Sequence, residues 1–230
     1  MSINSQVERP PVNETARIEA LSDGIIAIVI TLLAFEIGVP NPELLSDAGL
    51  FQALVAQWPT YFAFLLSFTI IGIMWSNHHT LFKIIARANP TFVLLNGLLM
   101  MTITLVPFAT LLLAEYLQHP DRRIAAFLYS TVVFLTAVSF QILWRYASHN
   151  NRLLDVNANP ALVAGFGQQY RYGPFYYLAT MIFALINVPL CLGFHVLLAV
   201  FFAVPGLVRN PQSAQQGEQI ASESTRPSDK

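Results

Sequence analysis

Residues 17–38 read RIEALSDGIIAIVITLLAFEIG, and this stretch decides the fold because a charged, polar start runs directly into an apolar helix. An ionisable group near hydrocarbon depth costs about 2.5 to 3.5 kcal/mol on insertion scales. Arg17 and Asp23 are therefore expected to have partners or to line water. The first apolar helix is the place where function is to be sought.

The composition places the chain in a membrane. Hydrophobic residues make up 55% of it and charged residues 11%, whereas soluble domains carry about 25% charged residues. The net charge is −1, and 12 Lys and Arg spread over the whole chain cannot form the basic surface that nucleic acid requires. The sequence contains no Ser-His-Asp, HExxH or Gly-rich phosphate motif. Nucleic acid is thus excluded as a partner, an enzyme has little support, and no cofactor is implied.

Six apolar segments are long enough to cross a bilayer, which needs about 20 residues or slightly fewer. They predict an all-α integral membrane protein with six transmembrane helices in one domain, residues 15–209. Asn187-Val188-Pro189 divides the last apolar stretch into two short helices. Residues 1–14 and 210–230 are polar and are expected to be disordered. The expected helices span 21–38, 58–76, 91–115, 124–146, 173–187 and 189–208.

The positions of Lys and Arg predict the orientation. If the N-terminus is cytoplasmic, ten of them lie on that side and only Arg122 and Arg123 lie outside. We therefore expect a multi-pass protein of the cell membrane with both termini in the cytoplasm. Asn41-Pro42 can start a short helix in the outer loop. The ten cytoplasmic residues are Arg9, Arg17, Lys83, Arg87, Arg145, Arg152, Arg171, Arg209, Arg226 and Lys230.

A polar cluster is expected at the cytoplasmic ends of the first two helices. The second helix is predicted to end in the run 75–79, WSNHH, at the depth of Arg17, Ser22 and Asp23. These groups can satisfy one another's donors and acceptors, as a low-dielectric site demands. A metal site is the weaker alternative, because the adjacent His78 and His79 project about 100° apart and do not form an i, i+4 chelating pair.

The apolar part of the first helix has one continuous stripe. At about 100° per residue, Ile28, Thr31, Leu32 and Phe35 share a face, and Asp23 points roughly 140° away from Ile28. Taken alone, such a stripe most often means packing, since Thr in a membrane helix commonly bonds its own preceding carbonyl. The polar and apolar parts of the helix therefore have different neighbours.

These residues resemble the transmembrane protein 175 family of potassium channels, in its prokaryotic single-repeat branch. The resemblance begins with Arg17, Ser22 and Asp23 at the start of the first helix. It extends to Trp75-x-x-His78-His79, to Asn96 in the third helix and to the stretch 105–110, LVPFAT. Leu21 stands where the family signature has Phe and keeps the apolar bulk. The structural network implied by this resemblance consists of Arg17, Ser22, Asp23, Trp75, His78 and Asn96.

The resemblance implies a potassium-permeable channel that is a homotetramer in the membrane lipid, with a central pore lined by the first helix of each subunit. No Thr-Val-Gly-Tyr-Gly filter is present in the sequence. By position from Asp23, the apolar constriction for K⁺ and related monovalent cations is Ile28, with Thr31 and Leu32 one turn outward. Phe35 lies near the outer end, where the family usually has Leu.

A proton-coupled secondary transporter that uses Asp23 and His78 stays open as an alternative. Titratable groups at membrane depth are the usual material of proton relays. Against it, the six expected spans contain no internal repeat and no pair of helices broken by Gly or Pro near the midplane.

Overall fold

A computed structural model describes residues 14–41 and 49–203, and within these ranges the chain is helical apart from turns and one isolated bridge between Ile85 and Leu154. The segments expected to be disordered lie outside these residues except for Glu14, with which α1 begins. The helix expected after Asn41 falls on residues 42–48, which are also outside. The helices are α1 (Glu14–Phe35), α2 (Gly49–Ala56), α3 (Trp58–Ile84), α4 (Pro90–Thr104), α5 (Val106–Tyr116), α6 (Arg122–Ser148), α7 (Pro160–Ile186) and α8 (Val188–Ala203).

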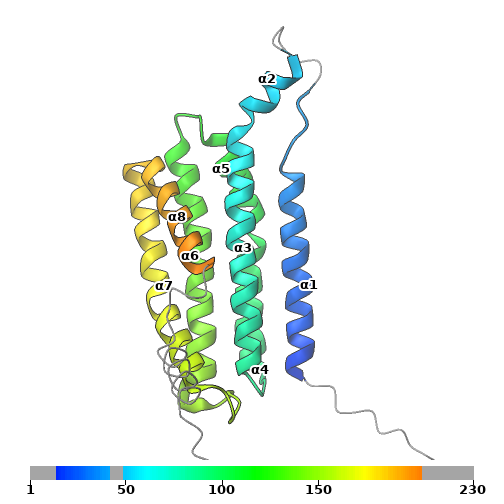
Figure 1. The fold of residues 1–230 in the computed structure, drawn as a ribbon, viewed down its shortest axis with the longest axis vertical. Helices are drawn as coiled ribbons and strands as arrows, with labels where there is room; N and C mark the ends of the chain where they lie inside the picture. The colour runs from blue at the N-terminus through cyan, green and yellow to red at the C-terminus, as the bar shows by residue number, and fades with distance from the viewer. Residues whose placement is uncertain (1–13, 42–48, 204–230) are drawn as a thin grey trace, which may run out of the picture.

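The long helices lie side by side along one direction, and α1 is at one edge of the group (Figure 1). It packs against α3, α4 and α5, while α6 and α7 form an extensive pair on the other side. The short α2 precedes α3 directly, with only Gln57 between them. The position of α1 at an edge leaves one of its faces uncovered within a single chain.

Asparagine side chains start three of the helices. Oδ1 of Asn89 accepts the backbone N–H of Phe92 at 2.9 Å, and Oδ1 of Asn159 accepts that of Ala161 at 2.9 Å. Pro90 and Pro160 follow directly, in the first helical position, where a missing N–H costs nothing. Asn187 caps α8 in the same way, through the N–H of Leu190 at 3.0 Å. The predicted break at Asn187 is thereby confirmed.

The third apolar segment is one rod with a break. Pro107 has no N–H to offer the carbonyl of Ile103, so the helix cannot continue regularly past Leu105. The Leu105 N–H donates instead to the Thr102 carbonyl at 3.3 Å. Residues Pro90–Tyr116 together still form one apolar length sufficient to cross a membrane.

Three predicted helices have the wrong bounds. α1 runs from Glu14 to Phe35, where residues 21–38 were predicted. α3 runs to Ile84, because apolar side chains continue after His79 and Leu81, Phe82 and Ile84 are all buried. The run 75–79 therefore lies inside the helix and does not end it. α7 begins at Pro160 and not near residue 173, and it passes through the buried Pro174 without ending.

Among the described residues, four helices are long and apolar enough to cross a membrane, so the chain is a multi-pass membrane protein. They are Glu14–Phe35, Trp58–Ile84, Pro90–Tyr116 and Arg122–Asn151, and Val188–Phe202 is a shorter apolar helix. Polar residues in the first half of α7 lower its average hydropathy. The architecture is all-α as predicted, whereas the count of six crossings remains a proposal.

Candidate functional site

The two faces of α1 have opposite surroundings. Ile26, Val29 and Leu33 are almost fully buried against the rest of the chain, with exposed fractions of 1%, 2% and 0%. Ile28 and Phe35 keep exposed fractions of 60% and 83%. Packing within the chain thus uses the opposite face. It does not account for the predicted stripe, which is largely apolar and is exposed.

The exposed stripe carries one polar group. Thr31 is exposed between Ile28 and Leu32, and its Oγ1 donates to the Ile28 carbonyl at 2.8 Å. The hydroxyl proton is occupied in this bond, while the oxygen lone pairs remain available on the exposed side. A row of such oxygens can accept from water or contact a cation.

A buried chain of hydrogen bonds joins α3, α4 and α1. Nε2 of His78 donates to Oδ1 of Asn96 at 3.0 Å, and Nδ2 of Asn96 donates to Oγ of Ser22 at 2.8 Å. Ser22 in turn donates to the Ile18 carbonyl at 2.9 Å. All three side chains are buried, so these bonds satisfy polar groups that water cannot reach. Asn96 uses both ends of its amide and fixes α1 relative to two other helices.

A second, more exposed set of bonds runs beside the first. Nε1 of Trp75 donates to Oδ1 of Asp23 at 3.1 Å. One turn toward the N-terminus of α1, Glu19 accepts from Nδ1 of His79 at 2.9 Å. The rings of Trp75 and His79 stack with centroids 6.0 Å apart. Two residues one turn apart on α1 thus meet two residues one turn apart on the antiparallel α3.

Of the six residues predicted for the network, five take part in these bonds and Arg17 does not. Its side chain is exposed and has no hydrogen bond or ion pair with any residue that the structure describes. Six residues along a helix turn it by about 240°, so Arg17 and Asp23 cannot face the same neighbour. The adjacent His78 and His79 bond to different helices, which separates their rings as their spacing predicts.

Glu19 is the residue of this polar cluster that the sequence analysis missed. The signal was the helical period, because Glu19 lies one turn before Asp23 and His79 one turn after Trp75. A bond between Asp23 and Trp75 across antiparallel helices implies the second bond. Recognising it required the register of α1 against α3.

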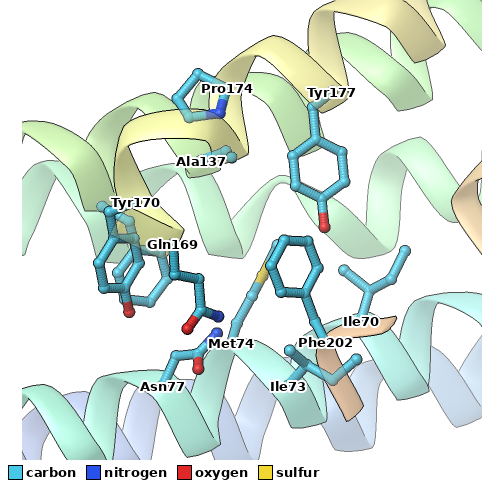
Figure 2. A pocket seen from close by; sticks show the side chains of 12 residues that line it. Ile70, Ile73, Met74, Asn77, Ala137, Gln169, Tyr170, Pro174, Tyr177 and Phe202 are labelled. Atoms are coloured by element: carbon cyan, nitrogen blue, oxygen red, sulfur yellow. The ribbon is translucent and has the colours of Figure 1, made fainter. Parts of the chain in front are cut away.

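A small cavity lies among α3, α6, α7 and α8, away from α1 (Figure 2). Its volume is ≈ 50 Å³, enough for a few water molecules at most. Asn77 and Gln169 approach one another at one end of it, and Tyr177 reaches in from α7 (Figure 2). The cavity is too small and too apolar to serve as an ion path through the chain.

Comparison with known proteins finds similarity to one family of channels. Residues 17–107 match the family described as endosomal/lysosomal potassium channel TMEM175. A potassium channel of Chamaesiphon minutus is 46% identical over 198 residues, which cover 86% of this chain and 98% of that protein. The endosomal/lysosomal proton channel TMEM175 of Gallus gallus is 36% identical over 143 residues, 59% of this chain and 28% of its own length.

A solved structure extends the similarity to the fold. The crystal structure of a lysosomal potassium-selective channel TMEM175 homolog from Chamaesiphon minutus superimposes with a TM-score of 0.76 at 44% identity. The match covers 83% of this chain and 96% of that chain. Sequence identity over nearly the whole of a relative, together with the same fold, shows that this chain belongs to the TMEM175 family of ion channels and is not an enzyme.

Proposed function

We propose that this chain forms a homotetrameric potassium-permeable channel whose pore is lined by the exposed stripe of α1. The observation that carries the proposal is the uncovered apolar face around Ile28 on a helix whose opposite face is fully packed. Contact with lipid alone gives no reason for a Thr in this stripe. Four copies of the stripe around one axis give each face a neighbour and enclose a path.

In this pore, Ile28 forms the constriction. Four Ile side chains at one level exclude water and close the path by dewetting, without a carbonyl filter. Opening requires the four helices to rotate or splay until an ion passes with part of its hydration shell. K⁺ holds its hydration water less tightly than Na⁺ does. The Thr31 oxygens replace part of the water that K⁺ loses. Selectivity for K⁺ is then real but modest. Leu32 and Phe35 line the wider outer part.

The polar network sets the rotation of α1 in each subunit. Asn96 and Ser22 hold its inner end from one side, and Asp23 and Trp75 hold it from another. Because these bonds lie on the face away from Ile28, they turn the stripe toward the axis. Opening is therefore expected above this level, in the part of α1 that has no polar bond to its neighbours.

The orientation proposed for the channel puts both termini in the cytoplasm of a cell whose plasma membrane holds the protein. The excess of Lys and Arg on that side supports it. Six crossings per chain are required, with α7 and α8 as the last two. Accessibility of cysteines introduced in the two termini to a membrane-impermeant reagent tests this topology.

A proton-coupled transporter remains the second candidate, favoured by one observation. His78 is fully buried, and its Nδ1 has no hydrogen-bond partner among the residues described. Such a nitrogen can accept a proton in a relay that also includes Asp23. The name of the chicken relative, a proton channel, makes proton movement a necessary control in any test.

Purified protein in liposomes separates the two functions. With a K⁺ gradient, a channel gives flux that stops at the K⁺ equilibrium potential, and a proton uncoupler only removes the opposing voltage. A carrier that couples K⁺ to protons instead moves K⁺ against its gradient when a pH gradient is imposed. Uphill K⁺ movement would contradict the channel, and the Ile28→Asn variant serves as the matched test of the path.

A further inference from the structure

A polar pocket lies between α6 and α7, far from the proposed pore. Its volume is ≈ 580 Å³, within the range of about 300 to 1,000 Å³ that is usual for ligand sites. It lies along the last two turns of α6 and the first half of α7, where Nε2 of Gln141 donates to the Arg171 carbonyl at 3.4 Å. The orientation proposed above places this end of both helices at the cytoplasmic leaflet.

Two positive charges face this pocket without a counter-charge. Arg145 of α6 and Arg171 of α7 both line it, and the lining includes no Asp or Glu. Both side chains are exposed, and neither has an ion pair or hydrogen bond with any residue that the structure describes. Two guanidinium groups gathered in one concave site raise the local concentration of anions, and their fork geometry matches phosphate.

Aromatic residues place the pocket at the depth of lipid headgroups. Trp144 and Tyr172 line it together with the amide of Gln168. Tyr172 is exposed, and exposed Tyr side chains gather at membrane–water interfaces. Trp144 itself is buried, and Gly167 lies beside its indole nitrogen, where an added Cβ would be 3.7 Å away. Gln168, Gln169 and Arg171 are the polar residues of α7 before its long apolar stretch from Gly173, so the pocket lies where a headgroup can meet the acyl region.

We propose that this pocket binds the phosphate of an anionic glycerophospholipid from the cytoplasmic leaflet, with Arg145 and Arg171 holding it from two helices. The Trp144 N–H and the Gln168 amide add neutral donors. The acyl chains then run along the apolar outer surface of α6 and α7. Such a lipid links two helices that the polar network of α1 does not reach.

Retention of lipid by the purified full-length protein tests the site. The protein is incubated with phosphatidylglycerol or phosphatidylcholine in detergent, and native mass spectrometry counts the lipids bound per chain. Binding of phosphatidylglycerol is expected to weaken about fivefold in Arg145→Gln or Arg171→Gln and about thirtyfold in the double variant. Arg87→Gln removes an exposed cation outside the pocket and should leave binding unchanged.

Each contrary outcome is informative. Equal retention of phosphatidylglycerol and phosphatidylcholine by the wild-type protein overturns the proposal without any variant. If Arg87→Gln weakens phosphatidylglycerol binding as much as Arg171→Gln does, general electrostatic attraction to the chain binds the lipid, and not this pocket. Displacement by millimolar glycerol phosphate means that the site takes soluble phosphates. Arg171→Lys, which keeps the charge and loses the fork, should fall between the wild type and Arg171→Gln.

Discussion

Asn96 is the residue on which the position of α1 depends most directly, because its single amide bonds to side chains of two other helices. Replacing Asn96 with Leu leaves His78 Nε2 and the Ser22 hydroxyl oxygen without these partners in a buried site. We expect the free energy of unfolding to fall by about 2 to 4 kcal/mol. Asn77→Ala is the control, since Asn77 lies on α3 next to His78 and makes no hydrogen bond within the described part of the chain.

Thermal unfolding of the detergent-purified variants, followed by size-exclusion chromatography, measures this effect. Asn77→Ala should stay within about 0.5 kcal/mol of the wild type. If Asn96→Leu were as stable as Asn77→Ala, the buried chain of hydrogen bonds would contribute nothing to holding α1.

Ile28 and Val29 separate the proposed gate from ordinary core packing. Ile28→Asn should raise basal cation current and weaken discrimination between K⁺ and Na⁺, because four amides hydrate the narrowest point. Val29 has an exposed fraction of 2%, so Val29→Asn should lower expression by burying an unpaired amide. Single-channel conductance and the reversal potential under mixed K⁺ and Na⁺ decide between these effects. Unchanged current in Ile28→Asn with a gain in Val29→Asn would assign the pore to another face.

Residue by residue, the helical period was enough to separate Ile28 from Val29, because burial in a helix follows angle. It was also enough to bring Asp23 near the run that starts at Trp75. It did not place Arg17 correctly. Arg17 is close to Asp23 in sequence, which suggested a shared network, but the angle of about 240° between them around the helix separates the two side chains. Glu19 was missed because its pairing with His79 depends on the axial register of α1 against α3. No local sequence pattern contains that register.

At the scale of the element, asparagine caps define the helix starts, and Asn89 has a second task. Besides capping α4, its Nδ2 donates to the Tyr146 hydroxyl of α6 at 2.9 Å. Asn159 caps α7, and the structure gives its side chain no second bond within the described residues. Asn89→Ala should therefore cost about 1 kcal/mol more than Asn159→Ala, whose own cost is about 1 kcal/mol.

Chemical or thermal unfolding of the two alanine variants gives this difference directly. Asn89→Asp keeps an acceptor for the Phe92 N–H, and the Tyr146 hydroxyl can donate to it, so most of the stability should return. Equal losses for Asn89→Ala and Asn159→Ala would mean that the contact with Tyr146 is energetically neutral.

Helix ends with a chemical stop were predictable, and those without one were not. Asn187 with Pro189 ends one helix and starts the next, which the sequence indicates and the structure confirms. The end of α3 has no such residue, and buried side chains beyond His79 extend the helix for another turn. α7 was expected to start after its polar residues, yet packing against α6 keeps residues 160–172 helical. Tertiary contacts override local polarity in both cases.

At the scale of the whole molecule, the fold is asymmetric. α6, α7 and α8 pack among themselves, α6 also packs against α4 and α5, and α8 packs against α3, whereas α1 contacts the remainder on one side only. The sequence predicts the helices and their order, but it does not reveal that the first is at the edge of the group. That position follows from which faces pack, and it is what makes a pore between chains possible. The proposed lipid site lies on the opposite side of the chain, where no pore contact is needed.

Assembly provides the last prediction. One α1 cannot enclose a path, so the proposal requires several chains around a common axis, and closed symmetry with four subunits is expected. Native mass spectrometry in mild detergent should give a tetramer of the 230-residue chain. Thr31→Cys, on the exposed face, should form disulfides between chains upon mild oxidation, because four copies converge near the axis. Val29→Cys, on the buried face, is the matched control and should form none. Cys191 is buried and free, so it adds no background. A strictly monomeric protein in lipid, or equal crosslinking at both positions, would contradict the proposed arrangement, since α1 would then not face its copies through the stripe around Ile28.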